Sequence, residues 1–459
     1  MIRLLRSVFL LALLTGVAVA ASPLQQATTA LEGLDPARIP SGRLYDRALP
    51  MSGLALQDGS GRGPAVAATT WRQMLHEMRL SSLTVPADWP TPDQAREEGR
   101  QAAARSVVPI AVLDVGYARL RPDALELGLV AFNNEGRLAE TAAAAKQSPY
   151  LTNRVFSAAA LAPRTYHGAQ VTFTMPRQLT VSDGPRPSHL QVDLADGRGW
   201  RDVRLDGELQ ASYDATGPRT LRLRATYADG VTREAAFSFE VAALVAPAPS
   251  ATWPITATVP WNGVYGFGQA YVYLAPGHAT VTDPVIVVEG FDLDNTMNWD
   301  ELYALLNREN MLEDLRADGF DAVVLNFNDS TDDMRRNAMI LVELLRQVGV
   351  AQPDGRDRVV IGASMGGLVA RYALAWMQQQ GQDPNVRSFI SFDSPQLGAN
   401  IPLGVQYWLQ LFQIEATEAG YLLSRLDTPA AREMLVYHHT SPAGPPDRPT
   451  RCARRSCPT

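Results

Sequence analysis

Cysteine is nearly absent from this chain of 459 residues. Its two cysteines, Cys452 and Cys457, both lie close to the C-terminal end. The preceding residues therefore have no disulfide framework, and hydrophobic cores must stabilise them. Without further cysteine or histidine ligands, the spacing of this pair is a poor zinc signal, so a local disulfide or an accidental sequence is the better interpretation.

The chain also lacks a large excess of charge of either sign. Its formal net charge is −7, only 19% of its residues are charged, and its mean hydropathy is −0.10. Such mild acidity argues against a dedicated nucleic-acid-binding protein, which is normally strongly basic. The even composition excludes a disordered acidic tail and a multi-span membrane protein. The length corresponds to about two to four domains.

Lysine is scarce as well, since Lys146 is the only lysine among 41 basic residues, which suggests a GC-rich bacterial genome. Residues 1–20 have the pattern of an export signal. Arg3 and Arg6 precede an apolar run over 8–14, and small residues at 18–20 suit cleavage before Ala21. The run is too short for a spanning helix of about 20 residues, so we expect a secreted or periplasmic protein without a transmembrane segment in its mature chain. A buried N-terminal helix is the alternative.

Two regions precede the first clear boundary. Residues 21–165 form a mixed α/β region, with helices expected at 69–78 and 92–104 and strands at 107–115 and 126–132. Residues 166–245 alternate apolar and polar residues in five short segments, at 171–175, 190–194, 209–213, 221–225 and 237–241. This rhythm predicts a small β-sandwich and resembles the immunoglobulin-like and PKD-like modules of secreted bacterial enzymes. A spacer is the simpler role for it, and contact with a surface polymer or a protein is the other.

Residues 246–254 are rich in proline and alanine and predict a linker. Beyond it, residues 255–440 alternate apolar strands with helices. The expected strands are 285–289, 322–327, 358–361 and 386–392, and the expected helices are 299–315, 332–348 and 365–379, with a helix-like stretch at 428–436. Near-continuous apolar strands between helices predict a parallel sheet covered on both faces, which makes this an α/β domain.

One motif in the α/β domain carries chemistry. The strand at 358–361 runs directly into Gly362-Ala-Ser364-Met-Gly366, and a helix follows. This is G-x-S-x-G in the order strand, tight turn, helix. A serine at the apex needs a strained backbone, and glycine on either side avoids collisions with the neighbouring strand and helix. The motif predicts Ser364 as an exposed nucleophile at a helix N-terminus, whereas a plain glycine-rich turn would not need this placement.

Residues 359–373 resemble the nucleophile elbow of the α/β-hydrolase superfamily, in its lipase and esterase branch, including PGAP1-like members. The branch usually has histidine before the serine, and this chain has Ala363. Residues 389–399 are similar to a lipase strand and loop with an S-P-H-x-G-like signature, in which Gln396 replaces the histidine. The resemblance extends over about residues 253–437. It implies hydrolysis of carboxylic esters through an acyl-enzyme on Ser364.

The same resemblance implies two backbone donors for the oxyanion of the tetrahedral intermediate. One is the amide of Met365, which follows the nucleophile. The other comes from the loop after the strand at 285–289, where Glu289 stands in the place of the family's histidine. Phe291 is the predicted donor in this loop, and Asp292 is the alternative.

The superfamily's triad follows the order serine, acid, histidine. Asp393, at the end of the last predicted strand, matches the acid position of some lipases, although a structural carboxylate that binds loop amides fits equally well. Two histidines follow Ser364, and of His438 and His439 we assign the latter as the base. The alternative is that both lie on the surface. The two strand–helix units that normally precede the family's histidine are not found after residue 392.

We therefore expect a secreted serine hydrolase for small-molecule or lipid esters, with hydrophobic esters favoured. An acyltransferase of the same fold is one rival, and an inactive hydrolase-like binding protein without a catalytic histidine is another. Acidic clusters at 292–295 and 328–333 could hold calcium, but they also suit loops and helix caps. We assign them no metal, and we expect no cofactor.

Residues 441–459 form an atypical tail rich in arginine and proline. Arginine, proline, alanine and cysteine are what a GC-rich gene yields when it is read out of frame. We therefore expect the chain after about His439 to be out of register, through a frameshift or a premature end, and the hydrolase domain to be incomplete.

Overall fold

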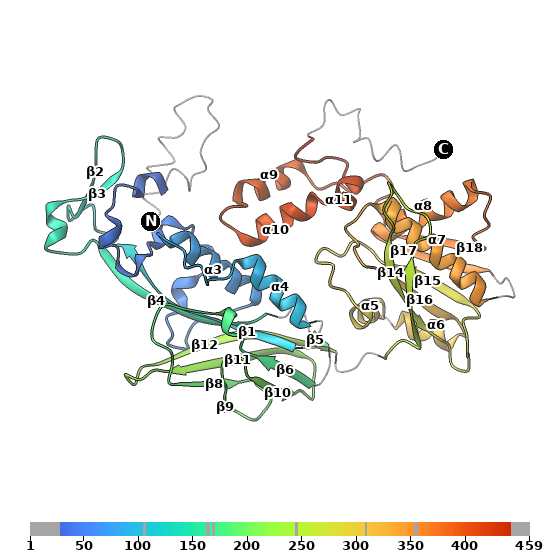
Figure 1. The fold of residues 1–459 in the computed structure, drawn as a ribbon, viewed down its shortest axis with the longest axis horizontal. Coiled ribbons are helices and arrows are strands. Elements are labelled where there is room, and N and C mark those ends of the chain that lie inside the picture. Colours follow the sequence, from blue (N-terminus) through green and yellow to red (C-terminus); the bar gives the residue numbers. More distant parts are fainter. Residues whose placement is uncertain are drawn as a thin grey trace. The chain divides into compact units, whose positions relative to one another are not determined.

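The structure is a computed structural model, and it describes residues 28–103, 107–161, 166–167, 170–243, 247–307, 310–352 and 357–441 (Figure 1). The expected signal peptide lies outside these residues, as does the tail from residue 442. The chain divides into two compact units. The first comprises Met1–Leu244 and Leu411–Glu418, and the second comprises Val245–Gln410 and Ala419–Thr459.

The first unit contains two five-stranded sheets. One has the order β10 (Glu208–Ser212), β6 (Gln170–Thr174), β1 (Val107–Leu120) and β4 (Tyr150–Ala160), with β7 (Thr180–Ser182) also paired to β1. The other has the order β5 (Tyr166–His167), β12 (Thr232–Ala243), β11 (Gly217–Thr226), β8 (His189–Asp193) and β9 (Trp200–Asp202). Alternate apolar residues of both sheets share one core, in which the rings of Phe173 and Phe239 lie 5.1 Å apart.

Helices α3 (Ala68–Ser81) and α4 (Pro92–Ala103) pack on the other face of the first sheet, where Trp71 and Leu113 share a core. Strand β1 is therefore buried on both faces. Because β1 pairs with β6, the boundary expected at 165–166 falls inside one sheet. Short elements complete the unit: β2 (Val130–Phe132), β3 (Leu138–Glu140) and the 3-10 helices Pro36–Arg38, Pro40–Gly42, Tyr45–Arg47, Leu54–Leu56, Ala142–Ala145 and Arg177–Leu179.

The second unit contains a six-stranded sheet. Its order is β13 (Ala251–Thr256), β14 (Phe267–Tyr273), β16 (Asp321–Phe327), β15 (Pro284–Val288), β17 (Arg358–Ala363) and β18 (Val386–Phe392). The last four strands pair in parallel, but β13 and β14 pair antiparallel. The sheet is therefore mixed, which corrects the parallel sheet expected from the sequence. Part of the expected linker is strand β13, where the edge position tolerates Pro254 because its missing N–H is not needed for pairing.

Helices cover both faces of this sheet. On one face α7 (Met334–Ala351) and α8 (Met365–Gln379) pack against Ile286, Val288 and Leu325. On the other face α5 (Trp299–Leu306) and α6 (Met311–Ala317) pack against Val287 and Val324. The helix expected over 299–315 is thus two helices, and α6 begins after Asn310, whose φ is 62°.

Three further helices follow the sheet: α9 (Leu403–Phe412), α10 (Thr417–Leu426) and α11 (Pro429–Met434). Strand β18 is the last strand of the sheet, and its apolar side chains Ile390 and Phe392 are exposed. Among the described residues, no helix is both long enough and apolar enough to cross a membrane.

Candidate active site

Ser364 lies at the junction where β17 ends and α8 begins. Its φ is 51° and its ψ is −125°, a backbone conformation that costs a residue with a side chain of order 1–3 kcal/mol. Two backbone hydrogen bonds hold the turn: the Ser364 amide donates to the Phe392 carbonyl (2.9 Å), and the Gly367 amide donates to the Ser364 carbonyl (3.2 Å). The serine side chain is exposed. The turn thus has the geometry of a nucleophile elbow.

Glycine is required on both sides of Ser364 because the backbone approaches so closely there. A Cβ atom on Gly366 would lie 2.4 Å from the Val288 carbonyl oxygen and 2.5 Å from that of Glu289. A Cβ atom on Gly362 would lie 2.5 Å from the Gly366 carbonyl oxygen. The first turn of α8 therefore packs directly on the end of β15.

The loop after β15 lies beside the serine, since a Cβ atom on Gly290 would be 3.3 Å from the Ser364 Cβ. Asp292 organises this loop: its carboxylate accepts hydrogen bonds from the amides of Thr296 (2.6 Å) and Met297 (2.8 Å). The Asp292 amide itself donates to the Ser330 hydroxyl (2.9 Å). Asp292 is therefore not free to bind an oxyanion. The acidic cluster around it serves loop amides, which is the alternative that the sequence favoured over calcium.

Two amides near Ser364 remain without a partner. Neither Phe291 nor Met365 donates a backbone hydrogen bond to another group within the described part of the chain. Met365 is the first residue of α8, where an amide has no acceptor within the helix and the helix dipole favours negative charge. These are the two amides that the sequence assigned to the oxyanion.

Glu289 is a feature that sequence reasoning noted only as a replacement for histidine. Its side chain is 5% exposed, and its Oε2 accepts a hydrogen bond from the Phe327 amide (2.7 Å). The other oxygen, Oε1, is buried and has no hydrogen-bond partner among the described residues. Burial raises the pKa of Glu289 to about 8, and the charge of Asp292 acts in the same direction. This carboxyl group is therefore protonated at neutral pH.

The predicted acid and base do not meet the serine. Asp393 is exposed, and within residues 357–441 no hydrogen bond joins Ser364 to Asp393, His438 or His439. Both histidines are buried, which corrects the surface position considered for them. The Asp393 backbone still lies near Ser364, because Asp393 follows Phe392, whose carbonyl accepts the hydrogen bond of the Ser364 amide.

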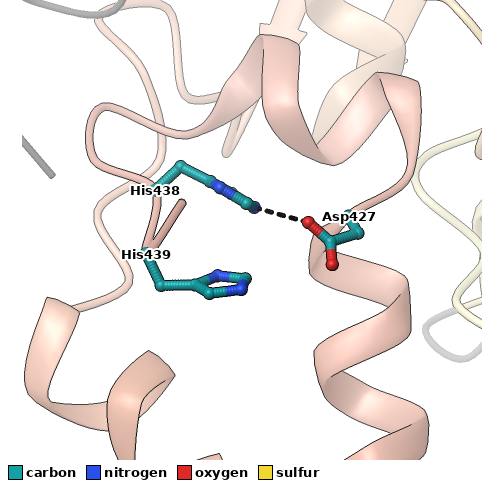
Figure 2. A group of neighbouring side chains, drawn as sticks. All are labelled: Asp427, His438 and His439. Atoms are coloured by element: carbon teal, nitrogen blue, oxygen red, sulfur yellow. Dashed lines mark ion pairs between the residues drawn. The ribbon is translucent and has the colours of Figure 1, made fainter. Parts of the chain in front are cut away.

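The histidines are grouped instead with Asp427, which the sequence did not single out (Figure 2). The His438 Nε2 lies 3.3 Å from an Asp427 carboxylate oxygen and 3.1 Å from the Leu426 carbonyl oxygen. Its Nδ1 lies 2.7 Å from the Thr440 hydroxyl. Burial lowers the pKa of His438, and the neighbouring His439 lowers it further. Sequence spacing gives no signal for this group, because packing of α10 and α11 creates it.

A mixed sheet with helices on both faces and a serine on a strained strand-to-helix turn resemble the nucleophile elbow of the α/β-hydrolase fold. In agreement, residues 337–426 match the family model described as lecithin:cholesterol acyltransferase. The matched segment includes β17, the Ser364 turn, α8 and β18. No curated protein matches the chain.

Several solved esterases have a similar structure. Est1E from Butyrivibrio proteoclasticus has a TM-score of 0.25 at 15% identity, covering 34% of this chain and 58% of its own. The esterase of Pyrobaculum calidifontis has a TM-score of 0.26 at 14% identity, and the match covers 40% of this chain and 61% of the esterase. Brefeldin A esterase, described as a bacterial homologue of human hormone sensitive lipase, has a TM-score of 0.24 at 14% identity, covering 41% and 57%. This chain spans less than two thirds of the length of each.

The close approach at Gly366 yields a stability prediction. We expect Gly366→Ala to lower the free energy of unfolding by about 1–3 kcal/mol or more, because the added Cβ must displace backbone carbonyls. Gly404→Ala is the matched control, since a Cβ atom there meets nothing within 4 Å and Gly404 lies in helix α9. We expect this control to be neutral or slightly stabilising in urea unfolding. Equal effects of the two substitutions would contradict the packing described here.

The raised pKa of Glu289 yields a prediction of pH dependence. Its carboxyl group ionises near pH 4.5 in the unfolded chain and near pH 8 in the folded one, so Glu289 lowers stability progressively between these values. Glu289→Gln removes this loss. The stability of the variant relative to the parent should therefore rise by on the order of 2 kcal/mol or more between pH 5 and pH 8, measured by urea unfolding.

Glu313→Gln is the control for this measurement. Although burial acts the other way, hydrogen bonds from Tyr303 and Arg316 hold the pKa of Glu313 below its ordinary value. Its substitution should therefore not stabilise the protein as pH rises. A flat difference between Glu289→Gln and the parent from pH 5 to pH 8 would show that Glu289 is ionised in the folded protein.

Proposed function

We propose that the protein is a serine hydrolase that cleaves carboxylic esters through an acyl-enzyme on Ser364. The observation that carries this proposal is the exposed serine on a strained turn, near two backbone amides that donate to no group among the described residues. Strain of this kind persists only where the surrounding packing imposes it, and it is concentrated at functional sites.

The proposed reaction has two halves. The Ser364 Oγ attacks the ester carbonyl carbon and loses its proton to a base, while the amides of Phe291 and Met365 bind the oxyanion. Collapse of the tetrahedral intermediate breaks the bond to the alcohol, which leaves with the proton from the base. Water then attacks the acyl-enzyme in the same way and releases the carboxylic acid and the serine.

For the base we propose His439, with Asp393 as the acid. The position of Asp393 directly after Phe392 supports its role, because the Phe392 carbonyl is bonded to the Ser364 amide. The His439 Nδ1 is buried without a hydrogen-bond partner among the described residues, so no bond has to break before it can take a proton. For this role the histidine must reach the serine, a contact that the described structure does not contain.

Two alternatives have specific support. The match to the lecithin:cholesterol acyltransferase model over residues 337–426 favours lipid or hydrophobic esters and also an acyltransferase, in which an alcohol replaces water as the acceptor. The grouping of both histidines with Asp427 favours an inactive hydrolase-like binding protein.

We also propose export of the protein, on the pattern of residues 1–20, and a spacer role for an immunoglobulin-like or PKD-like module in the first unit.

The nucleophile is tested by a fluorophosphonate probe and by hydrolysis of p-nitrophenyl butyrate. We expect the parent protein to be labelled, and Ser364→Ala to take no label and to lose at least about a thousandfold in kcat/KM. Ser424→Ala, an exposed serine on α10, is the control and should behave as the parent does. A parent protein that is neither labelled nor active would favour the binding protein.

The oxyanion loop is tested through Ser330. Ser330→Ala removes the acceptor of the Asp292 amide and the hydroxyl that donates to the Asp292 carbonyl (3.1 Å). We expect about a tenfold fall in kcat with a smaller change in KM, because a looser loop holds the transition state less well. Thr331→Val is the control, since this hydroxyl bonds Asp329 instead of the loop after β15. Equal kcat and KM values for the two variants would show that the Ser330 hydroxyl does not contribute to the reaction.

A further inference from the structure

Three side chains at the end of the described chain converge on one point. Asp427, His438 and His439 each offer one ligand atom, and these atoms lie within 4.8 Å of one another (Figure 2). We propose that they bind one divalent transition-metal ion, with zinc as the best fit. Two imidazoles and one carboxylate are ligands that zinc accepts readily, and they leave a fourth position open.

Gln406 of α9 holds the backbone that carries the histidines before any ion binds. The Gln406 side chain is fully buried. Its side-chain oxygen accepts a hydrogen bond from the His439 amide (2.9 Å), and its nitrogen donates to the Tyr437 carbonyl (3.0 Å). One side chain thus fixes the backbone on both sides of His438. Hydrogen bonds from residues that do not touch the ion are what keep metal ligands in position.

Hydrogen bonds around His438 direct its Nε2 toward Asp427. The Nδ1 accepts a hydrogen bond from the Thr440 amide (3.3 Å) and lies 2.7 Å from the Thr440 hydroxyl, so the ring proton belongs on Nε2, and an ion that binds there must displace it. The Leu426 carbonyl, 3.1 Å from Nε2, is a further oxygen ligand within reach. His438 is 3% exposed, so its imidazole has few hydrogen bonds to water that an ion would have to replace.

Asp427 keeps one oxygen for the ion. Its Oδ1 is shared by His438 and by Arg432, whose Nη2 lies 2.7 Å away. Its Oδ2 accepts no hydrogen bond from the described residues. The carboxylate is thus the oxygen ligand of the group, and Arg432 pairs with only one of its two oxygens.

The strongest indication is an unpaired atom. The Nδ1 of His439 is buried and has no hydrogen-bond partner among the described residues, and the whole residue is only 9% exposed. Figure 2 shows its ring beneath that of His438, directed toward Asp427, and the two ring centroids lie 4.4 Å apart. A purely structural histidine pair would be expected to satisfy this nitrogen, because a buried unpaired polar atom costs about 1–3 kcal/mol.

The required movement is small. Zinc ligands at about 2.0–2.2 Å from the ion lie about 3.4 Å apart in a tetrahedron. Side-chain rotations that move the ligand atoms by about 1 Å therefore convert the observed group into a coordination site. The filled site links the end of α10 to the segment after α11. It also has a consequence that depends on the proposed function: an ion on His439 withdraws that residue from proton transfer, so zinc should inhibit ester hydrolysis.

The test is calorimetric titration of the full-length, chelator-treated protein with zinc chloride, with thermal unfolding as a second readout. We expect one zinc ion per chain, and a higher unfolding temperature with zinc. Both effects should persist in Cys452→Ser/Cys457→Ser, which removes the thiols. His439→Gln and the partly exposed Asp427→Asn should each weaken binding at least about tenfold.

The matched control is His189→Gln, because His189 forms an exposed pair with Asp202 (2.8 Å) in the first unit and no third ligand lies beside it within the described part of the chain. It should bind zinc as the parent does. No binding at about 100 μM zinc, or equal binding by His439→Gln and the parent, would overturn the proposal. If the folding of a variant is in doubt, the visible spectrum of the parent protein with cobalt chloride decides, since tetrahedral histidine coordination gives intense bands and their absence refutes the site.

Ester hydrolysis measured with and without zinc distinguishes the proposed metal site from the proposed function. Zinc that binds and also lowers hydrolysis of p-nitrophenyl butyrate supports both the metal site and His439 as the base. Zinc that binds without changing the rate supports the metal site and removes His439 from the mechanism. A protein without any hydrolysis refutes the proposed function, while calorimetry still decides the metal site.

Discussion

The contact between the first turn of α8 and the end of β15 is the constraint on which the candidate site depends. Gly366 lies so close to the carbonyls of Val288 and Glu289 that no side chain fits between them. This approach places Ser364 at the apex of the turn, in a conformation that the flanking strand and helix impose. It also brings Gly290, and with it the following loop, next to the serine. Ser364 and the loop that we propose for the oxyanion are therefore positioned by one packing contact.

The same contact explains why a carboxyl group is buried next to the candidate site. Glu289 directly follows the last residue of β15 and is only 5% exposed. The free-energy cost of burying the Glu289 carboxyl group is reduced by one hydrogen bond from the Phe327 amide and by protonation of the carboxyl group. In the proposed reaction a charged carboxylate at this position would repel the oxyanion, whereas a neutral one would not. Asp292, three residues later, orders the loop through hydrogen bonds of its backbone and carboxylate with neighbouring amides and the Ser330 hydroxyl.

The elements nearest the serine could be predicted from the sequence almost residue by residue. Helix α8 and strand β18 have the expected bounds, because apolar runs and glycine punctuation there are local signals. Strands β13 and β14 were not predicted, since Pro254 and its neighbours are typical of a linker and no strand was expected before residue 285. Their strand character comes from pairing with β16 through β14, and a glycine at 268 fits there because the Asn326 carbonyl lies 2.7 Å from where a Cβ would be.

By itself the sequence determined the turn at Ser364 and the layered strand–helix pattern around it, because a strand, a Gly-x-Ser-x-Gly turn and a helix are set by neighbours in the chain. Only the tertiary structure decided the protonation of Glu289, the use of the Asp292 amide by Ser330, and the grouping of Asp427 with His438 and His439. The physical reason is the same in each case. Burial, unpaired atoms and ligand distances depend on which elements pack together, and residues from separate segments of the chain meet only when the fold is complete.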